Sequence, residues 1–159
     1  MIIPRTMAAA DIPTAVDVWL AAGKQEYTYL PLFQQLTPER AAEVFTKQIF
    51  EPCETWVAEL DGQCCAFVAL EGELLDRLYV HPDHQGRGIG KQLLRFCLSL
   101  RPQGLRLFTH QQNLRARQFY ESFGFRAVRF GVSPPPESAP DVEYVYGEPR
   151  AEGRDSDSV

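Results

Sequence analysis

The chain has 159 residues, of which 45% are hydrophobic and 23% are charged, and its formal net charge at pH 7 is −5. This length suits one well-cored domain and leaves little room for a second, so we expect a single domain over residues 1–150, followed by a polar, disordered tail over residues 151–159. No stretch comes near the roughly 18 consecutive apolar residues of a membrane helix, and the N-terminus does not combine a basic region with an apolar core, which argues against a membrane protein and favours a cytoplasmic location.

The first third of the chain predicts a short strand followed by two amphipathic helices. Residues 2–5 have the pattern of the strand, and apolar residues then recur at helical spacing over residues 12–20. Gly23 follows where the end of this first helix is expected, because glycine is the common residue after a helix terminus. Thr37 and Pro38 form an N-cap and first-turn pair, which predicts the start of the second helix.

Strand patterns follow the two helices. The runs ETWVAEL and QCCAFVAL flank Asp61-Gly62, a strong short-range signal for a β-hairpin. A further strand is predicted from Leu74 to Val80. Because helical and strand patterns alternate without an internal repeat, we expect an α/β fold.

A glycine-rich loop comes directly after this last strand, in the run HPDHQGRGIGKQLLRFCLSL. Gly86, Gly88 and Gly90 make the loop, and apolar residues at helical spacing from Ile89 to Leu100 show that the loop opens a helix. Backbone N–H groups at such a turn come within hydrogen-bond distance of phosphate oxygens, and the positive end of the helix dipole is directed at them. The pattern predicts a pyrophosphate-binding loop.

Charge is segregated along the chain in a way that favours an anionic ligand at this loop. Residues 84–120 hold seven Lys or Arg and no Asp or Glu, whereas residues 1–83 and 121–159 are net acidic. Acidic flanks would repel a long polyanion, so a compact polyphosphate fits better than nucleic acid. A Walker A loop is absent, and the G-x-G-x-G spacing, with no acid between Lys91 and Tyr120, argues against a dinucleotide site.

The four cysteines give no metal or redox signature. Cys64 and Cys65 are adjacent, Cys53 and Cys97 stand apart from them, and no C-x-x-C occurs. We expect free thiols that pack as small hydrophobic side chains, and no metal site.

The run from Gln85 to Gly90 matches Q/R-x-x-G-x-G/A and resembles the signature of the GNAT superfamily of N-acetyltransferases. Upstream, LLDRLYVHPDHQGRGIG is similar to the fourth strand and pyrophosphate loop of that superfamily, and downstream LFTHQQNLRARQFYESFGF is similar to its fifth strand and following helix. The resemblance implies one GNAT domain with a mixed, mostly antiparallel sheet of about seven strands and helices on both faces. It also implies an acyltransferase that uses acetyl-CoA as cosubstrate and an amine as acceptor.

The resemblance further implies which residues bind acetyl-CoA. Main-chain groups near the end of the strand before the loop would pair with the pantetheine arm like an added strand, and the N–H groups of residues 85–91 would hold the pyrophosphate. Arg87 is either a phosphate contact or a solvated surface charge, and Asn113 is expected to cap the next helix while facing the cofactor. The expected cofactor-binding residues are Leu78, Tyr79, Val80, Gln85, Gly86, Arg87, Gly88, Ile89, Gly90, Lys91 and Asn113.

Tyr120 is the residue that the resemblance places in the chemistry. It matches the family's tyrosine, whose hydroxyl lies near the thioester sulfur and protonates the departing thiolate. Its helical spacing with Ala116, Phe119 and Phe123 is also typical of an aromatic residue that only packs in the core.

The general base is left open by the sequence. Relatives that acetylate ribosomal-protein N-termini have a Glu where this chain has Phe108, so that base is missing. Asp76 is the first candidate for the base and would relay a proton through water. A role as a surface charge or as the partner of a nearby arginine explains an aspartate at this position equally well. His110, near the end of the fifth strand, is the second candidate. Strand alternation is expected to place four residues on one face: Leu74, Asp76, Leu78 and Val80.

The acceptor is expected to bind at two loops, residues 27–31 and 131–141, whose aromatic and acidic side chains suit a cationic amine but are also common in solvated loops. The resemblance predicts direct attack by a primary amine, from a small molecule or from a peptide or protein, through a ternary complex. We expect no nucleic-acid or membrane partner, and a homodimer is left open. The alternative is a non-catalytic acyl-CoA-binding regulatory protein of the same fold, and the third hypothesis is a nucleotide-binding module.

Overall fold

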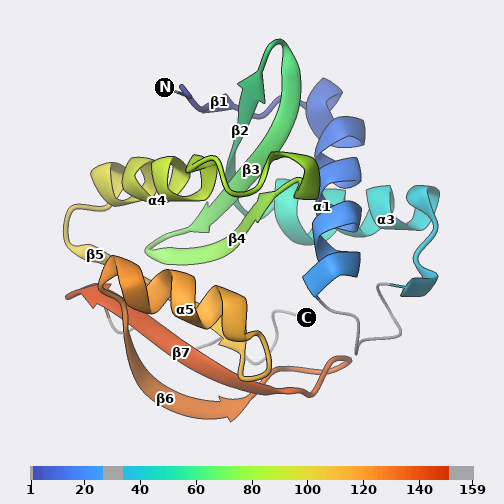
Figure 1. Ribbon diagram of the computed structural model, residues 1–159. Helices are drawn as coiled ribbons and strands as arrows, with labels where there is room; N and C mark the ends of the chain where they lie inside the picture. The colour runs from blue at the N-terminus through green and yellow to red at the C-terminus, as the bar shows by residue number, and fades with distance from the viewer. Residues whose placement is uncertain (1, 27–33, 151–159) are drawn as a thin grey trace. The chain divides into compact units, whose positions relative to one another are not determined.

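The computed structural model describes residues 2–26 and 34–150 (Figure 1). These residues form two compact units, which divide after Leu100. The acceptor loop expected over residues 27–31 and the tail expected over residues 151–159 lie outside the described residues. Each unit has its own strands, helices and core.

The first unit contains four antiparallel strands joined in sequence. They are β1 (Arg5–Thr6), β2 (Glu54–Leu60), β3 (Gln63–Glu71) and β4 (Leu74–Val80). The hairpin between β2 and β3 forms where the sequence predicts it, with φ values of 54° at Asp61 and 77° at Gly62. A two-residue type I′ turn needs such left-handed values at both positions.

Helices cover both faces of these four strands. One face packs against α1 (Ile12–Glu26), α3 (Pro38–Phe45) and the π-helical turn η2 (Thr46–Phe50), in a core that includes Phe45 and Phe67. On the opposite face α4 (Ile89–Leu100) contacts β3 and β4, and Figure 1 shows α1 and α4 on either side of the strands. Two short 3-10 turns, η1 (Ala9–Asp11) and η3 (Pro82–His84), come before α1 and α4.

Local sequence signals predict the start of α3 correctly but not the end of α1. Thr37 caps α3 as expected, since its hydroxyl accepts a hydrogen bond from the N–H of Arg40 at 3.2 Å and a proline opens the helix. The expected helix end at Gly23 is wrong, because α1 continues to Glu26 and buries Gly23. Tertiary packing along the helix overrides the local cap signal there.

The second unit contains three antiparallel strands and one helix. They are β5 (Gly104–His110), α5 (Leu114–Phe123), β6 (Arg126–Val132) and β7 (Pro140–Gly147), and β7 pairs with both β5 and β6. Asn113 caps the start of α5, and Gly124 ends the helix in the left-handed conformation. Aromatic rings fill the space between α5 and the strands; for example, the ring centroids of Tyr120 and Tyr144 lie 6.5 Å apart.

The fold class expected from the sequence is confirmed. The described residues combine helices with seven strands, and their strand pairings within each unit are antiparallel. Over residues 2–26 and 34–150, no helix is long and apolar enough to cross a membrane. The same part of the chain holds no group of three or more His, Cys, Asp or Glu side chains that could bind a metal ion.

Candidate cofactor and acyl-transfer site

The glycine-rich loop between β4 and α4 has open space beside its backbone. Gly86 and Gly88 have φ values of 79° and 80°, a left-handed conformation that other residues adopt only with strain. A Cβ atom added at either glycine would meet no other atom within 4 Å. The backbone conformation therefore favours glycine at these positions, and a ligand has room to approach them.

The amides at the start of α4 form the other half of this loop. The first hydrogen bond of the helix runs from the N–H of Gln92 to the C=O of Gly88 at 3.1 Å. The N–H groups of Ile89, Gly90 and Lys91 come before that bond, so they have no acceptor within the helix. Such first-turn amides and the positive end of the helix dipole together attract anions.

The end of β4 directs main-chain groups away from β3. The N–H of His81 donates to the C=O of Cys65 at 2.8 Å, which identifies a hydrogen-bonded pair of the ladder. Because antiparallel pairs alternate, the main-chain groups of Leu78 and Val80 face the other edge of β4. Gln85 ties the loop to the strand end, since its Nε2 donates to the C=O of Val80 at 3.0 Å.

Two of the expected cofactor residues have distinct settings. Tyr79 turns its main-chain groups toward β3, and its buried ring lies 5.7 Å from the ring of Phe67. This geometry gives Tyr79 a packing role and offers no support for a cofactor contact. Arg87 is exposed, which is compatible with both a phosphate contact and a solvated charge.

Asp76 lies at a β-bulge of β4. Leu70 pairs with Leu75, whereas the next residue along β3, Ala69, pairs with Arg77. Asp76 is therefore the extra residue of the bulged strand.

This bulge overturns the expected alternation along β4. Leu74 pairs with Glu71, and Leu78 pairs with Val68. Glu71 and Val68 are an odd number of residues apart, so they lie on opposite faces of β3. The prediction that Leu74 shares a face with Leu78 and Val80 is wrong.

The Asp76 carboxylate contacts a thiol and a guanidinium. Its Oδ2 lies 3.8 Å from the Sγ of Cys53 and 3.6 Å from a terminal nitrogen of Arg77. Cys53 packs against the core under α1, which places Asp76 on that side of the strands. Burial, assisted by the negative charges of Asp76 and Glu71, raises the pKa of Cys53 to about 12. The thiol therefore stays protonated and donates its hydrogen bond to Asp76.

In the second unit, Asn113 has a buried amide nitrogen that is not hydrogen-bonded. Its Oδ1 accepts a hydrogen bond from the N–H of Ala116 at 3.1 Å, so Asn113 caps α5 as expected. The residue is 7% exposed, and its Nδ2 finds no hydrogen-bond partner in the described part of the chain. An unpaired buried donor costs about 1–3 kcal/mol, so a ligand that supplies an acceptor there would be stabilised.

Tyr120 is the buried residue of α5 and belongs to an aromatic cluster. It is 9% exposed, and its ring centroid lies 5.1 Å from that of Phe119 and 5.5 Å from that of Phe125. The ring is thus a packed core aromatic, as one of the two interpretations of the sequence expects. Close packing also fixes the direction of the phenol, which a proton donor needs.

A buried carboxylate that sequence reasoning missed lies beside Phe108. Phe108 pairs across the ladder with Glu143 of β7, a residue that is 8% exposed. The Oε2 of Glu143 lies 2.7 Å from Arg129, and its Oε1 lies 3.8 Å from Arg106. Two arginines therefore neutralise this carboxylate. Its pairing with β5 joins segments about 35 residues apart in the printed sequence, so no local motif could have revealed it.

His110 lies at the end of β5 and contacts the loop between β6 and β7. The residue is buried, and its Nε2 lies 2.9 Å from Oε2 of Glu137. The sequence singled out His110 as a base candidate and residues 131–141 as an acceptor loop, without connecting the two. The structure brings them together.

The expected site residues fall in both units. The residues expected to bind the cofactor from Leu78 to Lys91 and the base candidate Asp76 belong to the first unit, whereas Asn113 and Tyr120 belong to the second.

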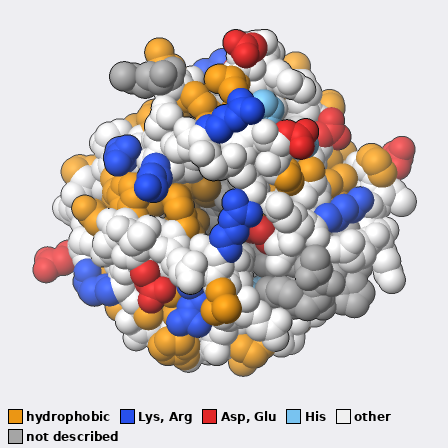
Figure 2. All heavy atoms as spheres, viewed as in Figure 1, with side chains coloured by type: hydrophobic (Ala, Val, Ile, Leu, Met, Phe, Trp, Pro, Cys, Tyr) orange, Lys and Arg blue, Asp and Glu red, His pale blue; other side chains and the backbone are white. Residues whose placement is uncertain are grey.

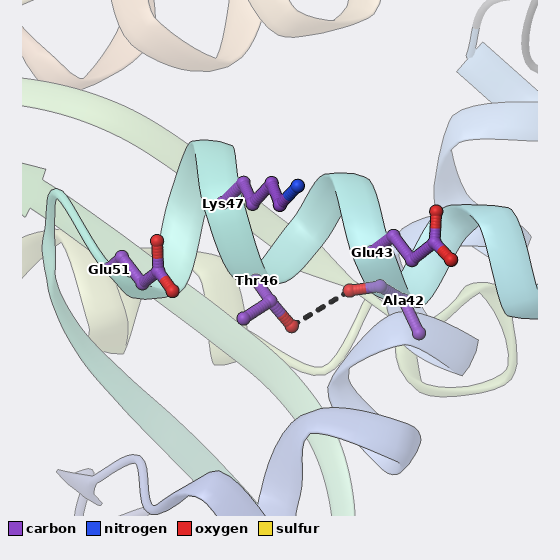
Figure 3. Close-up of a pocket in the computed structure, with 5 residues that line it drawn as sticks. All are labelled: Ala42, Glu43, Thr46, Lys47 and Glu51. Atoms are coloured by element: carbon purple, nitrogen blue, oxygen red, sulfur yellow. Dashed lines mark hydrogen bonds between the residues drawn. The ribbon is translucent and has the colours of Figure 1, made fainter.

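A hollow on the surface of α3 and η2 contains none of these residues. It has a volume of about 330 Å³ and is lined by Ala42, Glu43, Thr46, Lys47 and Glu51. Figure 3 shows these side chains along one stretch of helix, where the hydroxyl of Thr46 donates to the C=O of Ala42 at 2.8 Å. Mixed exposed charges of this kind are typical of a solvated helix face, so this hollow suggests no binding site.

The distribution of surface charge bears on the class of ligand. Figure 2 shows Lys and Arg side chains interspersed with Asp and Glu on the visible face, rather than gathered into one basic surface. A mixed surface of this kind suits a small anionic ligand better than a long polyanion.

Comparisons with known proteins agree with the resemblance in the sequence. Residues 51–127 match the family model described as an acetyltransferase (GNAT) domain. The chain is 42% identical over 74 residues to the peptidyl-lysine N-acetyltransferase YjaB of Salmonella typhimurium, a match that covers 46% of this chain and 50% of that protein. The chain thus spans about half the length of the curated relatives it matches.

Solved structures extend the similarity of fold to nearly the whole chain. The solution structure of apo-form YjaB from Escherichia coli has a TM-score of 0.74 at 24% identity, and the match covers 93% of this chain and 99% of that one. The PaiA N-acetyltransferase of Thermoplasma acidophilum in complex with coenzyme A has a TM-score of 0.65 at 21% identity, covering 92% and 99%. Residues 51–127 of the chain thus match an acetyltransferase (GNAT) domain, and the solved structures show that the chain shares their fold.

Proposed function

We propose that this protein binds acetyl-CoA and transfers its acetyl group directly to a primary amine in a ternary complex. The observation that carries the proposal is the loop at Gly86 and Gly88, where left-handed glycines leave open space next to the first-turn amides of α4. Pyrophosphate is the part of acetyl-CoA that suits this loop, because backbone N–H groups can donate to its oxygens.

The remaining cofactor contacts follow from main-chain geometry and from one buried amide. Leu78 and Val80 offer main-chain donors and acceptors at the edge of β4 away from β3, where an extended pantetheine arm could pair like a strand. Asn113 offers its buried Nδ2 as a donor from the second unit. A cofactor acceptor at this nitrogen would remove the penalty of an unpaired buried donor.

Tyr120 is the proposed general acid of the reaction. As the amine forms its bond to the acetyl carbon and the carbon–sulfur bond breaks, the thiolate needs a proton, which the phenol of Tyr120 supplies. The aromatic rings around Tyr120 hold the phenol in one direction, so little ordering is needed when the proton moves.

Asp76, the base expected from the sequence, remains a candidate. Its carboxylate contacts Arg77 and accepts a hydrogen bond from the Cys53 thiol. These two contacts occupy the carboxylate, so an incoming ammonium group would have to compete with them for Asp76. This competition weakens the case for Asp76 as the base.

For the acceptor, we propose a lysine side chain of a peptide or protein. The support is the name of the curated relatives, peptidyl-lysine N-acetyltransferase, together with the acidic residues of the loop over 131–141. A small-molecule amine is the second acceptor class. A non-catalytic acyl-CoA-binding role is less favoured, because such a protein has no need of a tyrosine at position 120. A homodimer and the absence of nucleic-acid partners stay predictions.

The test is native mass spectrometry of the purified protein, followed by an assay of coenzyme A thiol release with lysine peptides and small amines. We expect bound coenzyme A or acetyl-CoA and thiol release that depends on the amine. Binding without turnover on any amine would support the regulatory alternative, and no binding of coenzyme A would overturn both.

A further inference from the structure

His110 is held by a carboxylate from a different part of the second unit. Its side chain is 9% exposed, and Nε2 lies 2.9 Å from Oε2 of Glu137, whose side chain is 32% exposed. An ionised carboxylate only accepts hydrogen bonds, so Nε2 is the donor in this contact. The contact fixes the neutral tautomer of His110 with its proton on Nε2, and the basic nitrogen is then Nδ1.

The loop that carries Glu137 is closed by its own hydrogen bonds. The N–H of Ser133 donates to the C=O of Ala139 at 2.8 Å, and the N–H of Ala139 donates to the hydroxyl of Ser133 at 2.9 Å. On the β5 side, Gln111 donates from its main chain to the C=O of Pro140 at 2.9 Å. Glu137 therefore stands on a loop anchored next to His110, which is how a positioning carboxylate is supported.

His110 and Tyr120 lie on opposite faces of β5 and β7. Residues 106, 108 and 110 of β5 alternate with Leu107, which pairs with Tyr144 on the face that α5 covers. Tyr120 is on the α5 face and His110 is on the other. The strands therefore separate the two side chains, so no proton can pass directly between them.

The charged groups around His110 in the second unit are mostly acidic. Glu137 contacts it from the β6–β7 loop, and Asp141, which is 3% exposed, is its cross-strand partner on β7. Further along this face, Glu143 is neutralised by Arg106 and Arg129. The negative charge of Glu137 would offset the positive charge that the ring acquires when it takes a proton.

We propose that His110, oriented by Glu137, is the general base that takes the proton from the acceptor amine. The inference rests on the proposed acetyltransferase function. The amine nitrogen forms a bond to the acetyl carbon and passes its proton, directly or through water, to Nδ1 of His110. The carbon–sulfur bond breaks, and Tyr120 gives its proton to the sulfur. Solvent then takes the proton from His110 and returns one to Tyr120, which balances the cycle.

Replacing His110 tests the base directly. His110→Gln keeps a donor for Glu137, so the fold and the affinity for acetyl-CoA should be retained, which thermal unfolding and calorimetry can check. We expect kcat to fall about 10²- to 10⁴-fold, the usual loss for a general base, with KM for acetyl-CoA near that of the wild type. Added imidazole should restore part of the activity in His110→Ala, which also serves if the Gln variant folds poorly.

The pH dependence separates a base from a structural residue. The ratio of wild-type to His110→Gln kcat/KM cancels the titration of the acceptor amine, and it should rise with pH to a plateau. Glu137→Gln should lose about 10-fold in kcat, because the ring loses the carboxylate that orients it. Glu121→Gln, an exposed carboxylate change on α5, is the matched control and should behave like the wild type.

Two results would overturn the inference while leaving the proposed function intact. One is a flat pH ratio with unchanged kcat in His110→Gln. The other is a loss of activity confined to Asp76→Asn, which would return the role to Asp76. If the wild type releases no thiol with any amine, the proposed function and the base fail together.

Discussion

Adding one methyl group at Gly88 separates the role of the loop in binding from its role in folding. Gly88→Ala places a Cβ in the open space beside the loop, where a pyrophosphate oxygen is proposed to lie. At the observed φ of 80° the new side chain is also strained. A control is needed that has the strain without the ligand site.

Gly62 supplies that control in the same unit. It has a φ of 77° in the β2–β3 turn, and an added Cβ would again meet no atom within 4 Å. Left-handed strain costs about 1–2 kcal/mol per residue, and a stiffer unfolded chain offsets about 0.4–1 kcal/mol of it. Both variants should therefore lose about 1 kcal/mol of unfolding free energy, or roughly 2–4 °C in Tm.

Only Gly88→Ala should weaken binding of acetyl-CoA. Displacing one charge-assisted hydrogen bond costs about 1.5–3 kcal/mol, which corresponds to a Kd increase of roughly 10- to 150-fold. Calorimetric titration of both variants, beside their thermal unfolding curves, measures the two effects separately. Equal affinities of Gly88→Ala and Gly62→Ala for acetyl-CoA would refute the placement of pyrophosphate at this loop.

Three further outcomes are expected. Tyr120→Phe should keep fold and acetyl-CoA affinity but lower kcat about 10²- to 10⁴-fold; normal turnover with every accepted amine would reduce Tyr120 to packing. The Kd for acetyl-CoA should rise with salt, since exposed basic charges are screened over about 8 Å at physiological ionic strength, and calorimetry at two salt concentrations will show whether it does. Hydrogen bonds from Arg5 lower the pKa of Asp11 to about 2. This pair should therefore stabilise the fold above about pH 4, and its contribution should disappear as the pH falls toward 2. Asp11→Asn should remove this contribution from the acid unfolding curve.

Sequence reasoning succeeded where a few adjacent residues decide the backbone. Asp61-Gly62 determines its own turn, and Gly86 and Gly88 have left-handed φ values that favour glycine, whereas Gly90 lies within α4 and not in the loop. It failed where packing or strand register decides. Gly23 is buried inside α1, and the bulge at Asp76 arises from how β4 pairs with β3.

The choice of a general base is one case of this difference between local and long-range information. The sequence offered Asp76 through an alternation that the bulge breaks. It named His110 without its partner, because Glu137 lies 27 residues further along the chain and meets the imidazole only through the pairing of β5 with β7.

A carboxylate that orients a histidine can come from any loop that the fold carries to it, so a search for a base on the strands alone overlooks such a pair. In our proposal the general acid and the general base lie on opposite faces of β5 and β7. The proposed acid, Tyr120, is held within an aromatic cluster, whereas the loop over residues 131–141, which we propose binds the acceptor, also supplies the carboxylate that contacts the proposed base.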